Sequence, residues 1–198
     1  LSTGLPNEEM GKIGLGISPQ NPDVIYAGIE LANRKGGFWR SADGGASWVK
    51  QSYYVAGRTG PHYYQEVWPS PHAFDRVYHA DVRLHVTEDG GLTWRKVGEK
   101  AKHVDNHALW INPSNPHHLI LGTDGGAYVS YDRALYWRHV RSLPVSQFYH
   151  VSHDLEWPYN VYGGLQDNGS WIGPSAVRFN SSSDGKPFIL NEDWIAVY

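Results

Sequence analysis

The chain has 198 residues, enough for one domain with its own core, and its composition is 14% aromatic with 22 glycines and 12 prolines. This mixture favours short strands joined by tight turns over helices. A formal net charge of −3 argues against a broad nucleic-acid surface, and the absence of cysteine excludes disulfides, thiolate metal sites and cysteine nucleophiles. No apolar run approaches the ~18 residues that a membrane-spanning helix needs.

Repeat units follow one another along the chain, at approximately 11–52, 60–100, 105–144 and 145–175. Each unit begins with an apolar stretch, a turn rich in proline or asparagine and a second apolar stretch, as in Ile17–Tyr26 and Ile111–Leu121. The pattern predicts four antiparallel strands per unit. We expect 176–190 to be a loop, because it is rich in serine, glycine and proline, and 191–198 to start a further strand.

A short motif recurs near the end of the first three units. Ser41–Trp48 reads SADGGASW, and Thr87–Trp94, 46 residues later, reads TEDGGLTW. A third copy at Ser130–Trp137, SYDRALYW, keeps the serine, the aspartate and the tryptophan but has lost the glycine pair. The regular spacing indicates that the motif is structural.

Each residue type in the motif has a local task. The aspartate accepts hydrogen bonds from its own turn, glycine supplies a positive φ, and the tryptophan offers a large surface for packing. We therefore interpret these aspartates as turn formers and not as catalytic carboxylates. The structural residues of the motif are Asp43, Trp48, Asp89, Trp94, Asp132 and Trp137.

This motif resembles the Asp-box (BNR repeat) of sialidases, sortilin-type ectodomains, photosystem-assembly propellers and xyloglucanase-type glycoside hydrolases. The segments at 103–110, 122–128 and 163–169 are similar to bacterial secreted BNR-repeat glycosyl hydrolases, also described as sortilin-N-terminal-like proteins. The resemblance implies an all-β fold, a β-propeller of four-stranded antiparallel blades. About four blades are present, and we expect them to belong to a larger ring and not to a closed four-bladed one.

Within such a blade the loops after the second and fourth strands share one face, opposite the Asp-box hairpins. Aromatic and polar side chains gather in these loops, a mixture that suits a sugar. The candidate substrate-binding residues are Tyr53, Tyr54, His62, Tyr63, Tyr64, Arg83, Gln166 and Asn168.

Glycoside hydrolysis normally needs two carboxyl groups. Asp124, in the sequence Gly122-Thr-Asp-Gly-Gly126, is the first candidate, because the segment is similar to one that carries a catalytic aspartate in xyloglucanase-type enzymes. This chain lacks the residue that those enzymes place between the aspartate and the glycine pair. Asp167 is the second candidate, with Asp81, Asp105 or a residue of blades outside this piece as alternatives. Turn formation explains Asp124 and Asp167 equally well.

His103, Asp105 and His107 alternate, so on an extended strand they would share one side and could contribute to a zinc or iron site. Pinning of one unit to the next explains the same residues, and we predict neither a metal nor a cofactor.

The favoured function is an extracytoplasmic, secreted or periplasmic, carbohydrate-active propeller, with a glycoside hydrolase fragment as the enzymatic form; the chain alone is not expected to be active. The alternative is a non-enzymatic scaffold or interaction subunit of a larger assembly. The expected partners are a polysaccharide or a protein, with further blades or another subunit covering the open edges. The sialidase interpretation fails for want of an arginine triad, and the sortilin interpretation fails for want of a cysteine-rich module.

Overall fold

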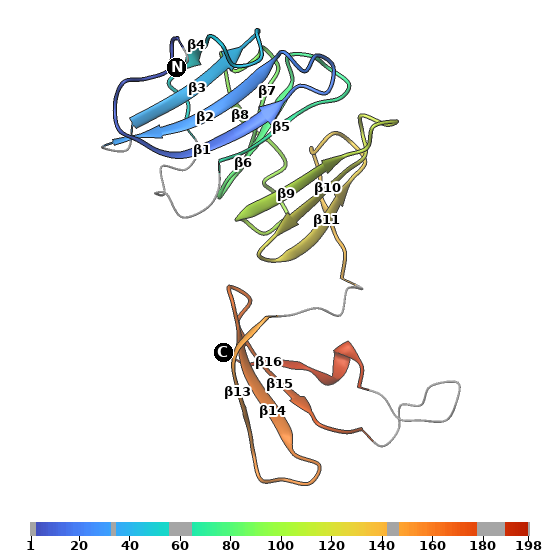
Figure 1. Cartoon of the computed structure of the whole chain (residues 1–198). Coiled ribbons are helices and arrows are strands. Elements are labelled where there is room, and N and C mark those ends of the chain that lie inside the picture. Colours follow the sequence, from blue (N-terminus) through green and yellow to red (C-terminus); the bar gives the residue numbers. More distant parts are fainter. Residues whose placement is uncertain (1–2, 33–34, 56–64, 142–146, 178–188, 198) are drawn as a thin grey trace. The chain divides into compact units, whose positions relative to one another are not determined.

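The computed structural model describes residues 3–32, 35–55, 65–141, 147–177 and 189–197. It divides into two units, Leu1–Val140 and Arg141–Tyr198 (Figure 1). Over the described ranges the structure is all β, with no α-helix and only a short 3-10 turn, η2 (Asn191–Asp193). None of these residues lies in a helix long and apolar enough to cross a membrane.

The described residues of the first unit form three four-stranded antiparallel sheets, each with its strands in chain order. The first sheet comprises β1 (Met10–Ile17), β2 (Ile25–Leu31), β3 (Lys35–Ser41) and β4 (Val49–Ser52). The second comprises β5 (Glu66–Pro69), β6 (Val77–Ala80), β7 (Leu84–Thr87) and β8 (Arg95–Lys96). The third comprises β9 (Asn106–Ile111), β10 (Leu119–Thr123), β11 (Gly126–Ser130) and β12 (Arg138–His139).

The second unit is one sheet of β13 (Phe148–His153), β14 (Asn160–Leu165), β15 (Ser170–Pro174) and β16 (Ile195–Val197). The stretch 191–198 was expected to start a further strand; its strand, β16, pairs with β15 and is the fourth strand of this sheet. The part of the chain that the structure describes thus forms four antiparallel four-stranded sheets, as the predicted blade architecture requires.

The turn between the first two strands has the same backbone hydrogen bond in all four sheets, so it defines equivalent positions in them. In each, the backbone N–H of one residue donates to the carbonyl six residues later, from Ser18 to Val24, Ser70 to Arg76, Asn112 to His118 and Asp154 to Asn160. These side chains also accept a hydrogen bond from the backbone two residues on, as Asn112 does from Ser114 at 2.8 Å. Residues counted from these positions are therefore structurally equivalent.

The aspartate hairpins close with the same hydrogen bonds in the first and third sheets. Asp43 Oδ1 accepts from the Ser47 backbone N–H at 2.8 Å, and Asp132 Oδ1 accepts from Tyr136 at 3.0 Å. In the third sheet Arg133 and Ala134 adopt the positive φ values, 58° and 69°, that glycines supply in the first. The capping bonds of the aspartate therefore maintain the turn without glycine.

Apolar residues on β5 and β9, the first strands of the second and third sheets, pack against the preceding sheet of the first unit. Val67 on β5 packs in a cluster with Tyr26 and Phe38 of the first sheet, and Leu109 on β9 packs with Tyr78 and Leu84 of the second. Leu15 on β1 occupies the equivalent position, three residues before its turn residue. It is 61% exposed, whereas Val67 is 6% and Leu109 5% exposed.

Candidate functional site

Two acidic loops of the first unit meet at the ends of the second and third sheets. Asp81 begins the turn between β6 and β7, and Asp124 begins the turn between β10 and β11. Asp105, just before β9, links them: its backbone N–H donates to the Val82 carbonyl at 3.1 Å, and its carbonyl accepts from the Asp124 N–H at 3.2 Å. Three aspartates therefore follow one another along a continuous backbone ladder, on the face opposite the aspartate hairpins.

Asp124 is held by a histidine. His107 Nε2 lies 2.6 Å from Asp124 Oδ1, and the side chains are 38% and 17% exposed. His107 is on β9 and Asp124 follows β10, so the antiparallel pairing of these strands brings the two together. The pair gives a solvent-accessible carboxylate with a defined orientation.

Asp81 has the opposite environment. It is fully buried, and neither carboxylate oxygen has a hydrogen-bond partner of good geometry. Burial raises the pKa of Asp81 to about 6; the backbone amide of Val82 opposes this shift, and Glu30 and Asp105 add to it. A carboxyl group in such surroundings keeps its proton into the mildly acidic range.

The aromatic residues next to this ladder pack inward. Tyr54 stacks on Trp94 with ring centroids 4.3 Å apart and approaches His79 at 5.5 Å. Burial, followed by the charge of Asp81, raises the pKa of the Tyr54 hydroxyl. One face of the Tyr54 ring is therefore covered by protein, which leaves less of the ring to bind a sugar than an exposed loop tyrosine would offer.

The other predicted binding residues of the first unit are more exposed. Tyr53 is 82% exposed and carries the Lys50 ammonium 3.8 Å from its ring centroid. Arg83 donates to Glu99 at 3.1 Å and remains 45% exposed. His62, Tyr63 and Tyr64 lie outside the described residues.

The remaining candidates belong to the second unit, where they form the turn between β14 and β15. Asp167 has a φ of 58°, Asn168 Nδ2 donates to the Gln166 carbonyl at 2.7 Å, and Trp171 Nε1 donates to the Asn168 carbonyl at 2.9 Å. These contacts are those of a turn. The catalytic role of Asp167 stays a prediction.

The metal hypothesis assumed that His103, Asp105 and His107 lie on one strand. The strand β9 begins only at Asn106, and Asp105 has a φ of 61°, so the alternation is broken. His103 Nδ1 contacts the Val104 carbonyl at 3.0 Å, and His107 pairs with Asp124. Over the described ranges no three histidine or acidic side chains are grouped for a metal ion.

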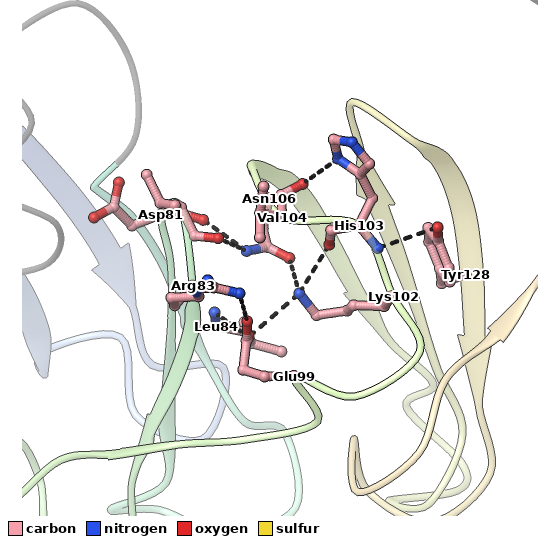
Figure 2. Close-up of polar contacts among 10 residues, drawn as sticks. Asp81, Arg83, Leu84, Glu99, Lys102, His103, Val104, Asn106 and Tyr128 are labelled. Atoms are coloured by element: carbon pink, nitrogen blue, oxygen red, sulfur yellow. Dashed lines mark hydrogen bonds and ion pairs between the residues drawn. The ribbon is translucent and has the colours of Figure 1, made fainter. Parts of the chain in front are cut away.

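Three further residues, for which the sequence pattern predicts no role, belong to this region. Lys102 and Asn106 form a buried polar connection beneath Asp81, and Glu99 ties Lys102 to the start of β7 (Figure 2). Asn106 lies within the His103, Asp105 and His107 pattern, whose alternation singles out these three residues and not Asn106. The one sequence signal for Lys102 is its place just before the third repeat unit, which begins at about residue 105.

No family model matches the chain. Among curated proteins, the xyloglucanase Xgh74A of Acetivibrio thermocellus is 25% identical over 150 residues, covering 64% of this chain and 16% of that protein. The chain thus spans about one-sixth of the length of the curated relatives it matches.

Solved structures show the same fold. The GH74 enzyme of Niastella koreensis has a TM-score of 0.55 at 14% identity, covering 92% of this chain and 29% of that one. The GH74 xyloglucanase of Xanthomonas campestris has 0.53 at 15%, covering 87% and 32%, and YCF48 of Cyanidioschyzon merolae has 0.51 at 15%, covering 87% and 56%. The chain is distantly homologous to a GH74 xyloglucanase, and its sheets resemble those of the β-propeller GH74 enzymes.

Proposed function

We propose that this chain is part of an extracytoplasmic, carbohydrate-active propeller of the glycoside hydrolase type, acting on a polysaccharide at the Asp81–Asp105–Asp124 ladder. The observation that carries the proposal is the contrast between two carboxyl groups on adjoining loops. Asp81 is buried without a well-placed hydrogen-bond partner, and Asp124 is accessible and paired with His107 at 2.6 Å. The distant homology to a xyloglucanase supports it.

The two environments suit the two tasks of glycoside hydrolysis. One carboxyl group must deliver a proton to the leaving oxygen, and the other must stay ionised to act as base or nucleophile. Asp81, whose pKa is raised to about 6, is suited to hold the proton. Asp124, whose Oδ1 is oriented by the His107 imidazole at 2.6 Å, is placed to serve as base or nucleophile.

The test is polysaccharide hydrolysis by the full-length protein, followed as reducing ends released from xyloglucan. We expect Asp124→Asn and Asp81→Asn each to lower kcat by at least about 100-fold with an unchanged fold. Asp23→Asn is the matched control, because Asp23 is an exposed aspartate on the hairpin face. Unchanged rates in both variants would remove this ladder from the mechanism.

A non-enzymatic role as an interaction subunit is the second candidate. The apolar side chains of β1 favour it, because Ile13, Leu15 and Ile17 are 41%, 61% and 60% exposed. Such a row of exposed apolar side chains on β1, the first strand of the first sheet, fits a further sheet or subunit packed against it. A full-length protein that binds xyloglucan or a protein partner without releasing reducing ends would favour this candidate.

A further inference from the structure

A lysine is buried below the acidic ladder with all its donors in use. The Lys102 side chain is 0% exposed, and Nζ contacts Asn106 Oδ1 at 2.9 Å, the His103 carbonyl at 3.2 Å and Glu99 Oε1 at 3.3 Å. Burial lowers the pKa of Lys102, and the Glu99 carboxylate opposes that shift. A buried ammonium group is costly unless its donors are paired, and here each of the three has an acceptor.

Lys102 dictates how Asn106 is oriented. An ammonium group can only donate, so the amide oxygen of Asn106 must face Nζ and the amide NH2 must point the other way. That NH2 donates to the carbonyls of Asp81 at 2.6 Å and Val82 at 3.2 Å. The Asn106 backbone N–H adds a second bond to the Asp81 carbonyl, at 3.0 Å.

The connection therefore fixes the backbone of the turn from which the Asp81 side chain projects. Figure 2 shows the carboxylate of Asp81 pointing away from Asn106 and Lys102, while the Asp81 carbonyl points toward them. Glu99 secures the other end of the turn, since Oε1 accepts from the Leu84 N–H at 2.9 Å and Oε2 from Arg83 at 3.1 Å. Asn106 thus binds the backbone of the turn, and the buried carboxylate takes no part in these contacts.

The groups that influence the Asp81 carboxyl come from several elements. Glu30 lies on β2, Asp105 precedes β9, and Tyr54, which senses the charge of Asp81, follows β4. His79 is two residues earlier on β6, and is buried and neutral at physiological pH. Glu30 and Asp105 are acidic and His79 is neutral, so burial remains the main cause that raises the pKa of Asp81.

We propose that Lys102 and Asn106 are positioning residues, which hold the Asp81 turn in the buried place where its carboxyl group can act as the proton donor. This inference rests on the proposed function for the catalytic part and on the contacts above for the positioning part. We call this pair the relay: Lys102 lies in the segment between β8 and β9, and Asn106 is the first residue of β9. The relay couples the Asp81 loop to the start of β9, and Asp105 extends the same coupling to Asp124.

The experiment follows the titration of Asp81 by NMR in protein with isotope-labelled aspartate carboxyls, with the signal assigned by its loss in Asp81→Asn. Lys102→Met keeps the length of the side chain but removes every donor. We expect the loosened turn to admit water and the Asp81 midpoint to fall by about 1 pH unit, toward the ordinary value near 4. Lys102→Arg should restore part of the shift, and Lys50→Met, a lysine of the same unit outside the relay, should change nothing.

Asn106→Ser serves as the second variant if Lys102→Met does not fold, and the same downward shift is expected. Folded variants with the wild-type Asp81 midpoint would overturn the positioning role. In the hydrolysis assay, the alkaline limb of the pH–rate profile should move down by the same amount, because Asp81 acts as an acid. A shifted midpoint in a protein that releases no reducing ends would reject the proposed function but keep the relay.

Discussion

His107 Nε2 on β9 lies 2.6 Å from Asp124 Oδ1, in the turn between β10 and β11. The pair is partly exposed, so we expect the modest coupling of a surface ion pair or hydrogen bond. A double-mutant cycle of His107→Ala, Asp124→Ala and the double variant should give a coupling free energy of about 0.2–1 kcal/mol in urea unfolding.

The coupling should shrink in about 1 M salt, because exposed charges are then screened over about 3 Å. A coupling of zero at low salt would show that the contact does not orient Asp124 in solution.

Equivalent positions on the first strands of the first and third sheets allow the effect of burial on stability to be compared. Leu109 and Leu15 are equivalent leucines, but Leu109 is packed against the second sheet and Leu15 is 61% exposed. We expect Leu109→Ala to lower the free energy of unfolding by about 2–5 kcal/mol, because it removes buried methyl groups and leaves a cavity. Leu15→Ala should change it by less than about 0.5 kcal/mol. Similar losses at both positions would mean that β1 is covered in solution.

Much of the fold follows from residues that act locally. The aspartate hairpins were predictable because one side chain satisfies its own turn, and the third copy keeps these contacts without the glycine pair. The role of β16 was not predictable, because Ile195–Val197 pairs with β15 across a long intervening segment. The residues near each strand do not determine which distant strand it pairs with.

The sequence predicted which face of the sheets carries the candidate site, but it did not predict all the residues that form the site. Strand alternation placed Asp81, Asp105 and Asp124 on one side of the sheets, since the loops that carry them follow from strand order. The separate expectation that His103, Asp105 and His107 alternate along one strand failed, because the positive φ of Asp105 breaks the extended chain before β9. Strand alternation also missed Lys102 and Asn106, because the partners of a buried polar group depend on which sheet comes to lie beside it.

The aspartate hairpins predict a specific response to acid. Hydrogen bonds from the Ser47 hydroxyl and backbone, and then from Ser41, lower the pKa of Asp43 from 3.8 to about 2. A carboxyl group with a lowered pKa in the folded state stabilises that state above pH 4, and this contribution is lost as the pH falls toward 2. The midpoint of thermal unfolding for Asp43→Asn should therefore lie below that of the wild type at pH 5.

This gap between wild type and Asp43→Asn should close near pH 2. Asp23→Asn, an exposed aspartate on the same face, is the control for a general charge effect. A gap that stays constant from pH 5 to pH 2 would contradict the role of the ionised carboxylate in the turn.

His79 makes the stability of the fold depend on pH in a second, higher pH range. It is fully buried, and burial, followed by the neighbouring His85, lowers the pKa of His79 to about 3, against a backbone contact from Gln65. The unfolded chain binds a proton near pH 6.5, whereas the folded chain stays neutral, so stability is complete above pH 6.5 and falls as the pH is lowered below it. One such proton corresponds to a slope of about 1.4 kcal/mol per pH unit between about pH 6 and pH 4.

We expect urea unfolding of the wild type to show this slope and His79→Leu to lose most of it, since leucine keeps an apolar side chain beside Phe38 and Tyr54 without a titrating ring. His117→Leu, at an exposed position, should leave the slope in place. Equal slopes for the wild type and His79→Leu would show that His79 takes up its proton in the folded state, and that the interface between the first two sheets tolerates the charge.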